Sequence, residues 1–396
     1  MKIALLADAF LPQGGGSRVY YYNLYKNLVA QWADRVVVLT KKVPGWKEFD
    51  SRESTESLRI VRRFRPFLNL KYYQWPRAVW QSVDSVWFAL REQVDVVHIG
   101  DLLPQGLAGP GLKHLRGVPY VMFAHGDEIA QTDRRRYQPI LRDRIYRNAD
   151  AVIAANEIAR QSLIRIGVPE RRIYKITPGV DCERFRPQPP NEALVREFDL
   201  QGKTVLLTAA RLVPRKNLDT VIQAVGRVAC ENSDLRYLIL GDGAERQHLE
   251  QIVENLGLRS VVRFVGPVSN RTIGDFYNLC DLFVLANRVT PDGDIETFGM
   301  VFVEANAAGK AVVGGRSGGA AEAIVDKVTG FLVDPEDVEE MAATLKMLLE
   351  NPSLRQKLGA AGLRRARSEF DWKSRAQMLR QISDEIVQRA RHGEPQ

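Results

Sequence analysis

The sequence predicts an α/β protein of two tandem domains, each built on a doubly wound, mostly parallel sheet. Its 396 residues exceed what one hydrophobic core usually holds, because domains cluster near roughly 100–200 residues. Short β-branched runs alternate with helical patterns along the chain, an order typical of βαβ units. A break at Cys182–Pro190 interrupts the alternation once, because its three prolines stop regular structure. We therefore expect one domain on each side of this break.

The expected strands form two series, one before and one after the break. The first series is Ile3–Ala7, Val36–Thr40, Leu58–Val61, Val94–Ile99, Val118–Ala124, Ala151–Ala155 and Ile173–Ile176. The second series is Thr204–Ala209, Tyr237–Leu240, Val261–Val265, Leu282–Leu285, Ala311–Gly314 and Gly330–Val333. Because helical patterns separate the strands, each series should form a parallel sheet.

The domain boundaries follow from the break and from the last helical pattern. We expect a first domain over residues 1–185, a linker over 186–200, a second domain over 201–370 and a final helix within 371–396. The final helix is predicted from apolar residues at helical spacing, namely Trp372, Met378, Leu379, Ile382 and Ile386. Ligands of open α/β sheets bind beyond the carboxyl ends of the strands, so two such edges facing each other would form one cleft.

The composition excludes several classes of protein. With 45% hydrophobic and 26% charged residues, the chain is neither collagenous nor disordered. Cys182, Cys230 and Cys280 are too far apart for a zinc cluster or a CxxC motif, so we expect no metal site and a reducing, cytoplasmic location. The amino-terminal residues favour a strand over a signal peptide, and no apolar run approaches the roughly 18–20 residues of a membrane span.

The net charge of +8 is concentrated in the first half of the chain. Residues 1–190 hold 30 Lys and Arg against 19 Asp and Glu, a balance of +11, and residues 191–396 hold 26 against 29, a balance of −3. One basic cluster consists of Arg134, Arg135, Arg136, Arg142, Arg144 and Arg147. Such a cluster suits an anionic phospholipid surface, a phosphorylated acceptor or nucleic acid, and it is equally consistent with a solvated helix face.

A glycine loop follows the first expected strand. Gly14, Gly15 and Gly16 precede a helical pattern, so their N–H groups could approach a phosphate at a helix N-terminus. The dinucleotide-binding fingerprint does not fit, because Val19 stands where its third glycine belongs and no acidic residue ends the second strand. The alternative is a loop with no ligand.

His125 follows the strand expected over Val118–Ala124, which is where a parallel sheet presents ligand-binding residues. Gly126 comes next and keeps the backbone accessible. A single histidine is as often a structural residue, so both interpretations stay open at this point.

Basic residues follow the first strand of the second series. Arg211 and Lys216 lie five positions apart, with Pro214 stiffening the turn between them. Arginine can grip a diphosphate with two bonds while lysine acts as a compact point charge, so this pair fits a diphosphate ligand. The alternative is a basic loop without a ligand.

Two carboxylates flank a second expected helix start. Glu296 follows the strand Leu282–Leu285, and seven residues separate it from Glu304 in an apolar helical run. Residues 298–300 should then form a helix N-terminus with free N–H groups, which suits an anion. Carboxylates beside such a site favour the hydroxyls of a sugar and a ribose.

In this order, these residues resemble the retaining GT-B glycosyltransferases of the large family 4, which transfer a sugar from a nucleotide-diphosphate donor. The resemblance covers essentially the whole chain: the glycine loop, His125-Gly-Asp-Glu128, Thr177-Pro-Gly-Val-Asp181, the Arg211 to Lys216 loop, and the pair Glu296 and Glu304. It implies two Rossmann-like domains facing a cleft, with the final helix crossing back to the first domain.

The resemblance also implies residue roles. The amides of Gly15 and Gly16 would face the donor phosphate, His125 would contact the transferred sugar, and Arg211 and Lys216 would hold the departing diphosphate. Glu296 would bond the sugar hydroxyls, the amides of Phe298, Gly299 and Met300 would meet sugar and phosphate, Glu304 would hold the ribose, and Val265 and Gly266 would lie near the base. Thr297 departs from the glycine commonest at its position in the family, which leaves the donor sugar undecided.

The function implied is that of a retaining hexosyltransferase that needs neither cofactor nor metal. It would move a hexose from a GDP-mannose or UDP-glucose type donor to a lipid-linked, glycan or small-molecule hydroxyl, and it would not bind nucleic acid. Arg211-Leu-Val-Pro-Arg-Lys216 is most similar to bacterial phosphatidylinositol-mannoside mannosyltransferases, which implies GDP-mannose, a lipid acceptor and a cytoplasmic enzyme with or without attachment to the inner membrane face.

Two enzyme classes of the same architecture remain as alternatives. A nucleotide-sugar epimerase would need no acceptor, and a sugar phosphorylase would need a lysine-bound pyridoxal site that the sequence does not reveal. The acceptor should be shaped by loops around residues 41–80 and 101–117. The aromatic segment Trp75–Trp80, with Trp87 and Phe88, is either an apolar acceptor face or part of the core.

Overall fold

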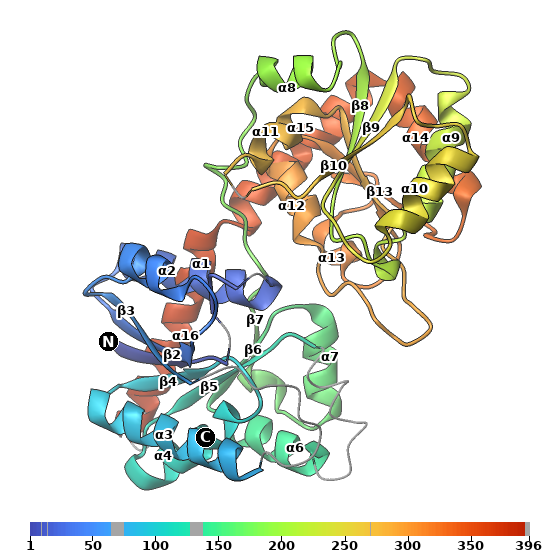
Figure 1. Cartoon of the computed structure of the whole chain (residues 1–396). Coiled ribbons are helices and arrows are strands. Elements are labelled where there is room, and N and C mark those ends of the chain that lie inside the picture. The colour runs from blue at the N-terminus through green and yellow to red at the C-terminus, as the bar shows by residue number, and fades with distance from the viewer. Residues whose placement is uncertain (9, 14, 65–74, 127–137, 270, 393–396) are drawn as a thin grey trace. The chain divides into compact units, whose positions relative to one another are not determined.

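In the computed structural model, the chain forms two compact units that are described one at a time (Figure 1). The structure describes residues 1–396 apart from 9, 14, 65–74, 127–137, 270 and 393–396. Unit 1 comprises Met1–Pro178 and Trp372–Gln396, and unit 2 comprises Gly179–Asp371. The chain therefore passes from unit 1 to unit 2 at Pro178, ahead of the linker expected over 186–200.

Unit 1 is built on a seven-stranded parallel sheet of order β3-β2-β1-β4-β5-β6-β7. The strands are β1 Lys2–Leu6, β2 Arg35–Lys41, β3 Leu58–Phe64, β4 Val96–Ile99, β5 Tyr120–Ala124, β6 Ala151–Ala154 and β7 Ile173–Lys175. All strands of the first predicted series are confirmed, with ends shifted by up to three residues. The central strands are buried on both faces, which explains why their sequences are continuous apolar runs.

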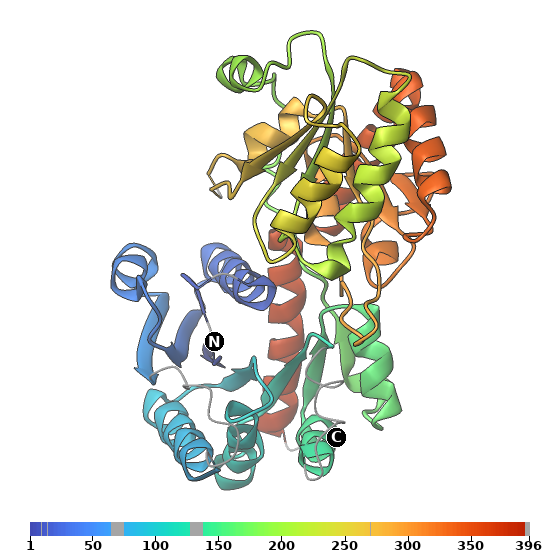
Figure 2. The same cartoon turned by 45° about the vertical axis from the view of Figure 1, so that its right-hand side comes forward.

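Helices cover both faces of the unit 1 sheet. They are α1 Gly16–Gln31, α2 Trp46–Glu53, α3 Trp75–Glu92, α4 Ala108–Arg116, α6 Gln138–Asn148, α7 Glu157–Arg165 and α16 Trp372–His392, with short 3₁₀ turns η1 Gln105–Leu107 and η2 Glu170–Arg172. One core joins α1 and α16 to the sheet through residues such as Leu24 and Leu379. The other joins α3, α4, α6 and α7 to the opposite face through residues such as Phe88 and Leu112 (Figure 2).

The carboxy-terminal helix α16 is tied into unit 1 by a fully buried histidine. The Ser383 hydroxyl donates to the Leu379 carbonyl at 2.7 Å, so it accepts from Nε2–H of His98 at 3.0 Å. The Tyr25 hydroxyl then donates to Nδ1 of His98 at 2.7 Å. Burial lowers the pKa of His98 to about 3, so this histidine is a neutral structural link between β4, α1 and α16.

Unit 2 holds a six-stranded parallel sheet of order β10-β9-β8-β11-β12-β13. The strands are β8 Thr204–Ala209, β9 Leu235–Leu240, β10 Val262–Gly266, β11 Leu282–Leu285, β12 Ala311–Gly315 and β13 Gly330–Val333, which confirms the second predicted series. The helices are η3 Pro214–Lys216, α8 Glu192–Glu197, α9 Leu218–Ala229, α10 Arg246–Asn255, α11 Ile273–Leu279, α12 Met300–Ala307, α13 Ala320–Ala323, α14 Val338–Glu350 and α15 Pro352–Glu369. In Figure 1, α9, α10 and α14 cover one face of this sheet while α11, α12 and α15 cover the other.

The aromatic segment of α3 is divided between core and surface. Phe88 is 2% exposed and belongs to the core beneath α3, whereas Trp80 is 60% exposed and Trp87 is 52% exposed. Helix α8, which starts at the N-cap Asn191, lies inside the stretch expected as a linker. Within the described ranges, no helix is both long and apolar enough to cross a membrane.

Each sheet has one point where its strand order reverses. In unit 1 the reversal lies between β1 and β4, and in unit 2 it lies between β8 and β11. Loops leaving the carboxyl ends of the two strands diverge there and leave a crevice in which open α/β sheets bind their ligands. The residues following β1, β4, β8 and β11 are therefore the first to examine for a site.

Candidate functional site

The loop after β8 carries one exposed cation and one buried cation. Arg211 is exposed, and within the part of the chain that the structure describes it has no ion pair or side-chain hydrogen bond. Lys216 ends η3 and is only 8% exposed. Pro214 is the first residue of this turn, as its fixed φ favours, and Lys216, the last residue of the turn, is buried. Arg211 is thus available to an incoming anion, while Lys216 is already engaged.

Lys216 and Glu296 form an ion pair between the loops after β8 and β11. Arg215 Nη1 pairs with Asp294 Oδ2 at 2.7 Å, and Arg215 Nε lies 3.8 Å from Glu296 Oε2. Two consecutive cations therefore meet two nearby carboxylates at the reversal point of the unit 2 sheet. The two cations and two carboxylates balance one another, so the buried Lys216 is not left unpaired.

Glu296 is held as a carboxylate. Burial alone would raise its pKa, but Lys216, Arg215 and a hydrogen bond from the Gly299 amide outweigh burial and keep the pKa below its ordinary value of 4.5. The Glu296 carboxylate oxygens are therefore acceptors at neutral pH. Such acceptors suit sugar hydroxyls, which donate.

The start of α12 is fixed by glycine. Gly299 is the N-cap, with φ 83°, and a side chain there would be strained because L-residues rarely adopt this conformation. Phe298 before it is 4% exposed and packs against Phe370, with ring centroids 5.7 Å apart. No side chain caps α12, and the Phe302 amide donates to the Gly299 carbonyl at 3.1 Å, so the amide of Met300 is the first that could meet a ligand.

A second glycine turn, Ser317-Gly-Gly319, packs against the loop that carries Glu296. The Gly319 amide donates to the Glu296 carbonyl at 2.7 Å, and a Cβ at Gly319 would lie 2.0 Å from the Thr297 oxygen. Only glycine permits this approach of the loop after β12. The turn Ser317-Gly-Gly319 thus positions the backbone on which Glu296 and Phe298 sit.

Glu304 lies on α12, beyond Glu296 in the chain, and bonds Tyr277 of α11. The Tyr277 hydroxyl donates to Glu304 Oε2 at 2.8 Å. Burial raises the pKa of Glu304 above its ordinary value, although the Tyr277 bond and the charge of Arg184 oppose this rise. Val265 and Gly266 end β10, where the Gly241 amide donates to the Gly266 carbonyl at 2.8 Å.

In unit 1, the start of α1 is open. Gly15 is the N-cap of α1, Gly16 is its first residue, and both are exposed. No side chain caps this end and no acidic residue lies in its first turn. The start of α1 can therefore offer amides to an anion, while Asp8, at the carboxyl end of β1, is paired with Lys41.

His125 follows β5 and is oriented by Tyr21 of α1. The Tyr21 hydroxyl lies 2.7 Å from the Gly100 carbonyl and 2.7 Å from Nε2 of His125. A carbonyl can only accept, so the single hydroxyl proton goes to Gly100 and Tyr21 must accept from His125. Nε2 therefore carries a proton. The His125 carbonyl in turn accepts from Asn156 at 2.8 Å, which fixes the backbone as well.

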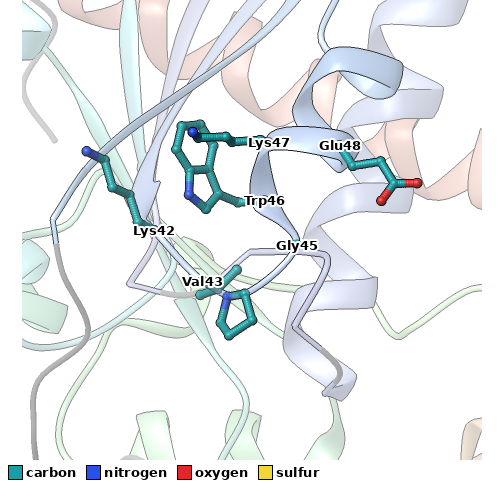
Figure 3. A pocket seen from close by; sticks show the side chains of 7 residues that line it. Lys42, Val43, Gly45, Trp46, Lys47 and Glu48 are labelled. Carbon is teal, nitrogen blue, oxygen red and sulfur yellow. The ribbon is translucent and has the colours of Figure 1, made fainter.

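An open pocket of about 590 Å³ lies between β2 and α2 in unit 1 (Figure 3). It is lined by the continuous segment Lys42–Glu48. The Nζ atoms of Lys42 and Lys47 lie 5.9 and 6.0 Å from the centroid of the Trp46 ring. The pocket thus combines two cations with one aromatic face, and it falls inside the segment expected to shape the acceptor site.

Most of the chain matches two glycosyltransferase family models. Residues 14–184 match Glycosyltransferase Family 4, and residues 192–365 match Glycosyl transferases group 1. A D-inositol 3-phosphate glycosyltransferase of Nocardioides sp. is 31% identical, with 95% of this chain and 86% of that protein covered. The chain belongs to the family 4 glycosyltransferases.

Further relatives and solved structures agree with this assignment. A GDP-mannose-dependent alpha-(1-6)-phosphatidylinositol monomannoside mannosyltransferase of Mycolicibacterium smegmatis is 28% identical over 96% of this chain and 97% of its own. The fold of this glycosyltransferase is that of Anabaena HepE in complex with UDP, with a TM-score of 0.80 at 20% identity over 97% of this chain and 100% of that one. Sucrose-phosphate synthase of Thermosynechococcus elongatus matches with a TM-score of 0.78 at 21% identity over 98% and 99%. The GT-B architecture predicted from the sequence is therefore confirmed.

The structure brings the predicted residues of this glycosyltransferase together in two groups. In unit 2, the loops after β8 and β11 carry Arg211, Lys216, Glu296, Phe298 and Gly299, α12 carries Met300 and Glu304, and β10 ends at Val265 and Gly266; Lys216 and Glu296 are in direct contact. Unit 1 carries Gly15, Gly16 and His125 on the loops and helix start that follow β1 and β5.

Sequence reasoning missed the residues that orient these groups. Tyr21 and Tyr277 hold His125 and Glu304, and Arg215 supports Glu296. Tyr21 could have been anticipated from its place on the helix after the glycine loop, one turn in, but Tyr20 and Tyr22 beside it gave no reason to choose among them. At the unit 1 edge, Asp8 also pairs with Lys41.

The predicted arginine cluster is corrected at one position, Arg142. Arg134, Arg135 and Arg136 lie outside the described residues. Arg142 is 3% exposed and its Nη2 pairs with Asp143 at 2.8 Å, so it cannot reach a partner surface. Arg144 and Arg147 of α6 are exposed. Across the described ranges, no three His, Cys, Asp or Glu side chains gather in a way that could hold a metal ion.

Proposed function

We propose that this glycosyltransferase is a retaining hexosyltransferase whose donor binds at the reversal point of the unit 2 sheet. The observation that carries the proposal is the meeting of Lys216 with Glu296 beside the exposed Arg211 and the uncapped start of α12. These groups offer cations and amides to a diphosphate, and a carboxylate to sugar hydroxyls. Glu304, which accepts from the Tyr277 hydroxyl, would accept from a ribose hydroxyl as well.

The chemistry follows from where charge builds. As the bond between the sugar C1 and the diphosphate oxygen breaks, negative charge grows on that oxygen, and Arg211, Lys216 and the α12 amides offset it without a metal ion. The acceptor hydroxyl attacks C1 from the same face, and its proton passes to the departing phosphate oxygen. The new bond then has the configuration of the old one, which is retention.

Support for the donor comes from the relatives. The mycobacterial relatives are named as GDP-mannose-dependent, and HepE was solved with UDP and with UDP-glucose. We propose GDP-mannose as the donor, with a UDP-hexose as the second candidate. Thr297, beside Glu296, is the residue at which a sugar preference would be set.

For the acceptor, we propose a hydroxyl compound that carries a phosphate. The relatives act on a phosphatidylinositol mannoside and on inositol 3-phosphate, and both acceptors contain a phosphorylated polyol. The Lys42–Glu48 pocket offers matching chemistry, because Lys42 and Lys47 can neutralise a phosphate while Trp46 packs against a ring (Figure 3). Replacing both lysines with Gln should raise the acceptor KM and leave donor hydrolysis unchanged.

The experiment that tests the proposal is ligand stabilisation followed by product analysis. A donor nucleotide at 100 times its Kd should stabilise the folded chain by about 2.7 kcal/mol, so a panel of nucleotides and nucleotide sugars identifies it by its melting shift. Reaction of that sugar with inositol phosphate and phosphatidylinositol acceptors should give an α-linked product by NMR. A sugar altered without acceptor would favour an epimerase, and an inverted linkage would contradict retention.

A further inference from the structure

The outer surface of three neighbouring helices collects the exposed apolar side chains of unit 1. Among the described residues of this unit, all large hydrophobic side chains that stand exposed lie on α3, α4 and α6. They are Val79, Trp80, Val83 and Trp87 on α3, Leu115 on α4 and Ile140 on α6. Because α3 contacts α4 and α4 contacts α6, we call this area the α3–α4–α6 surface.

Helix α3 is apolar on two opposite sides. Phe88 and Ala89 face the core beneath it, while Val79, Val83 and Trp87, spaced four apart, form a stripe on the solvent side. Val83 is 60% exposed and Trp87 is 52% exposed. A surface helix normally presents polar residues on its outer side, so this stripe is not explained by the folding of unit 1.

The charges around the stripe have one sign. On the described parts of α3, α4 and α6, the exposed ionisable side chains are Arg91, His114, Arg116, Arg144 and Arg147. The acidic side chains of these helices are partly buried and paired: Asp84 with Arg63 at 2.9 Å, Glu92 with Lys2 at 3.1 Å and Asp143 with Arg142 at 2.8 Å. Asp143 also lies 3.6 Å from Arg147, so the uncompensated positive charge of the surface is that of Arg91, Arg116 and Arg144.

Aromatic and basic groups are also in direct contact. The guanidinium carbons of Arg63 and Arg91 lie 5.8 and 5.3 Å from the Trp87 ring centroid. Tryptophan prefers the boundary between water and hydrocarbon, and arginine beside it can keep its charge among headgroups while its stem covers apolar area. This combination matches the composition of surfaces that lie at a membrane interface.

We propose that the α3–α4–α6 surface docks reversibly on an anionic phospholipid bilayer, with Trp80 and Trp87 entering the headgroup region. The aliphatic side chains of Val79, Val83, Leu115 and Ile140 would be buried there, whereas a nucleic acid offers them no apolar partner. A second copy of the chain is disfavoured, because two such surfaces would bring like charges together. The proposal goes beyond the transfer reaction, since it places the enzyme on a membrane whatever its acceptor is.

The docking requires both of its components. Apolar insertion and electrostatic attraction to anionic lipid are each weak alone, and stable attachment usually takes two such signals. Removing either the two tryptophans or the arginines should therefore release the protein. Raising the salt concentration should weaken docking, because it screens the arginines.

The test is flotation of the full chain with vesicles of phosphatidylcholine alone and of phosphatidylcholine mixed with phosphatidylglycerol, without donor or acceptor. We expect binding to the mixed vesicles only. Trp80→Ser with Trp87→Ser should weaken it at least about tenfold, and Arg91→Gln with Arg116→Gln and Arg144→Gln about 100-fold. Leu256→Ser with Val328→Ser, and Arg259→Gln with Arg364→Gln and Arg367→Gln, change exposed residues of unit 2 and should bind like the wild type.

Three results would overturn the proposal. One is equal binding of the surface variants and the unit 2 controls to mixed vesicles, with all variants folded by circular dichroism. Another is binding of RNA or DNA that the same surface substitutions abolish while vesicle binding is absent. The third is a wild-type dimer that the Trp80 and Trp87 substitutions convert to monomer. Because donor hydrolysis is measured separately, failure of docking leaves the proposed function standing.

Discussion

The candidate site of unit 2 and that of unit 1 are held together by different forces. In unit 2, Lys216 and Arg215 meet Glu296 and Asp294, so charges fix the loops after β8 and β11. In unit 1, the Tyr21 hydroxyl orients His125 through hydrogen bonds with Nε2 of that histidine and with the Gly100 carbonyl. Charged groups are therefore concentrated at the unit 2 site, where a diphosphate would gain charge as it leaves.

This difference predicts that substitutions in the two units reduce activity to different extents. Losing one donor that stabilises developing charge typically costs about 10²–10³ in turnover, whereas one hydrogen bond contributes about 0.5–1.5 kcal/mol, which is at most about tenfold. Substitutions of the charged groups of unit 2 should therefore cost more than substitutions of the hydrogen-bonding groups of unit 1.

The largest effect is expected for Lys216→Ala. Turnover should fall by about 10²–10³ because the departing diphosphate loses a buried cation. Steady-state kinetics with saturating donor measures this, and Lys203→Ala, which removes a cation paired with Asp234 away from the site, is the matched control. Near-normal turnover in a folded Lys216→Ala enzyme would show that Lys216 has no catalytic role. It would also contradict the expected difference between the two units.

The next effect concerns stability and its dependence on pH. Glu296→Gln leaves the buried Lys216 without its carboxylate and should lower the free energy of unfolding at pH 7 by about 1–3 kcal/mol. Because the folded pKa of Glu296 lies below 4.5, its stabilisation is present above that pH and is lost as the pH falls through the folded pKa. Denaturant unfolding should show that the free energies of unfolding of the wild type and Glu296→Gln converge at acid pH. For the exposed Glu369→Gln control, the difference from the wild type should stay constant with pH. A constant difference across pH would contradict the ion pair.

The strands, and the positions of the candidate site residues just after them, could be predicted because they depend on local patterns. Every strand was found from apolar runs, and Gly299 as a helix start followed from the chain order of β11 and α12. Buried parallel strands need continuous apolar sequence, which makes them conspicuous. The same reasoning placed Glu296 and Arg211 at strand ends, where an α/β sheet binds ligands.

Partners across the fold could not be predicted in this way. Tyr21 reaches His125 across 104 residues and Lys216 reaches Glu296 across 80, and no local pattern encodes either contact. The prediction for Arg142, one member of the arginine cluster, was wrong for a related reason. Arg142 looks like its exposed neighbours in sequence, but helical periodicity turns it inward, where it is 3% exposed.

A smaller effect is expected for Tyr21→Phe. Loss of the hydroxyl removes the acceptor that keeps the proton on Nε2 of His125, so turnover should fall about tenfold with little change in donor KM. Nitrogen NMR of labelled histidine should show Nε2 protonated in the wild type and a mixture of tautomers in the variant. Tyr22→Phe, whose hydroxyl donates to Glu53, is the control. An unchanged histidine spectrum would mean that Tyr21 does not set the tautomer.

The smallest effect is expected for Tyr277→Phe. This variant tests whether the loss of activity depends on the kind of interaction removed or on the unit in which the residue lies. This hydrogen bond lies in unit 2, yet it should behave like the one in unit 1 and weaken donor binding only about three- to tenfold. The Tyr277 bond lowers the pKa of Glu304, so its loss lets that already raised pKa rise further. The carboxylate is then protonated at a higher pH than in the wild type, and donor affinity should begin to fall at a correspondingly higher pH. Titration calorimetry with the donor nucleotide at several pH values measures this shift, and Tyr237→Phe, which loses a buried bond to Thr208, should leave the pH dependence unchanged. A loss of donor affinity of about 100-fold or more at neutral pH would show that location in unit 2, rather than the charge of the group, sets the size of the effect.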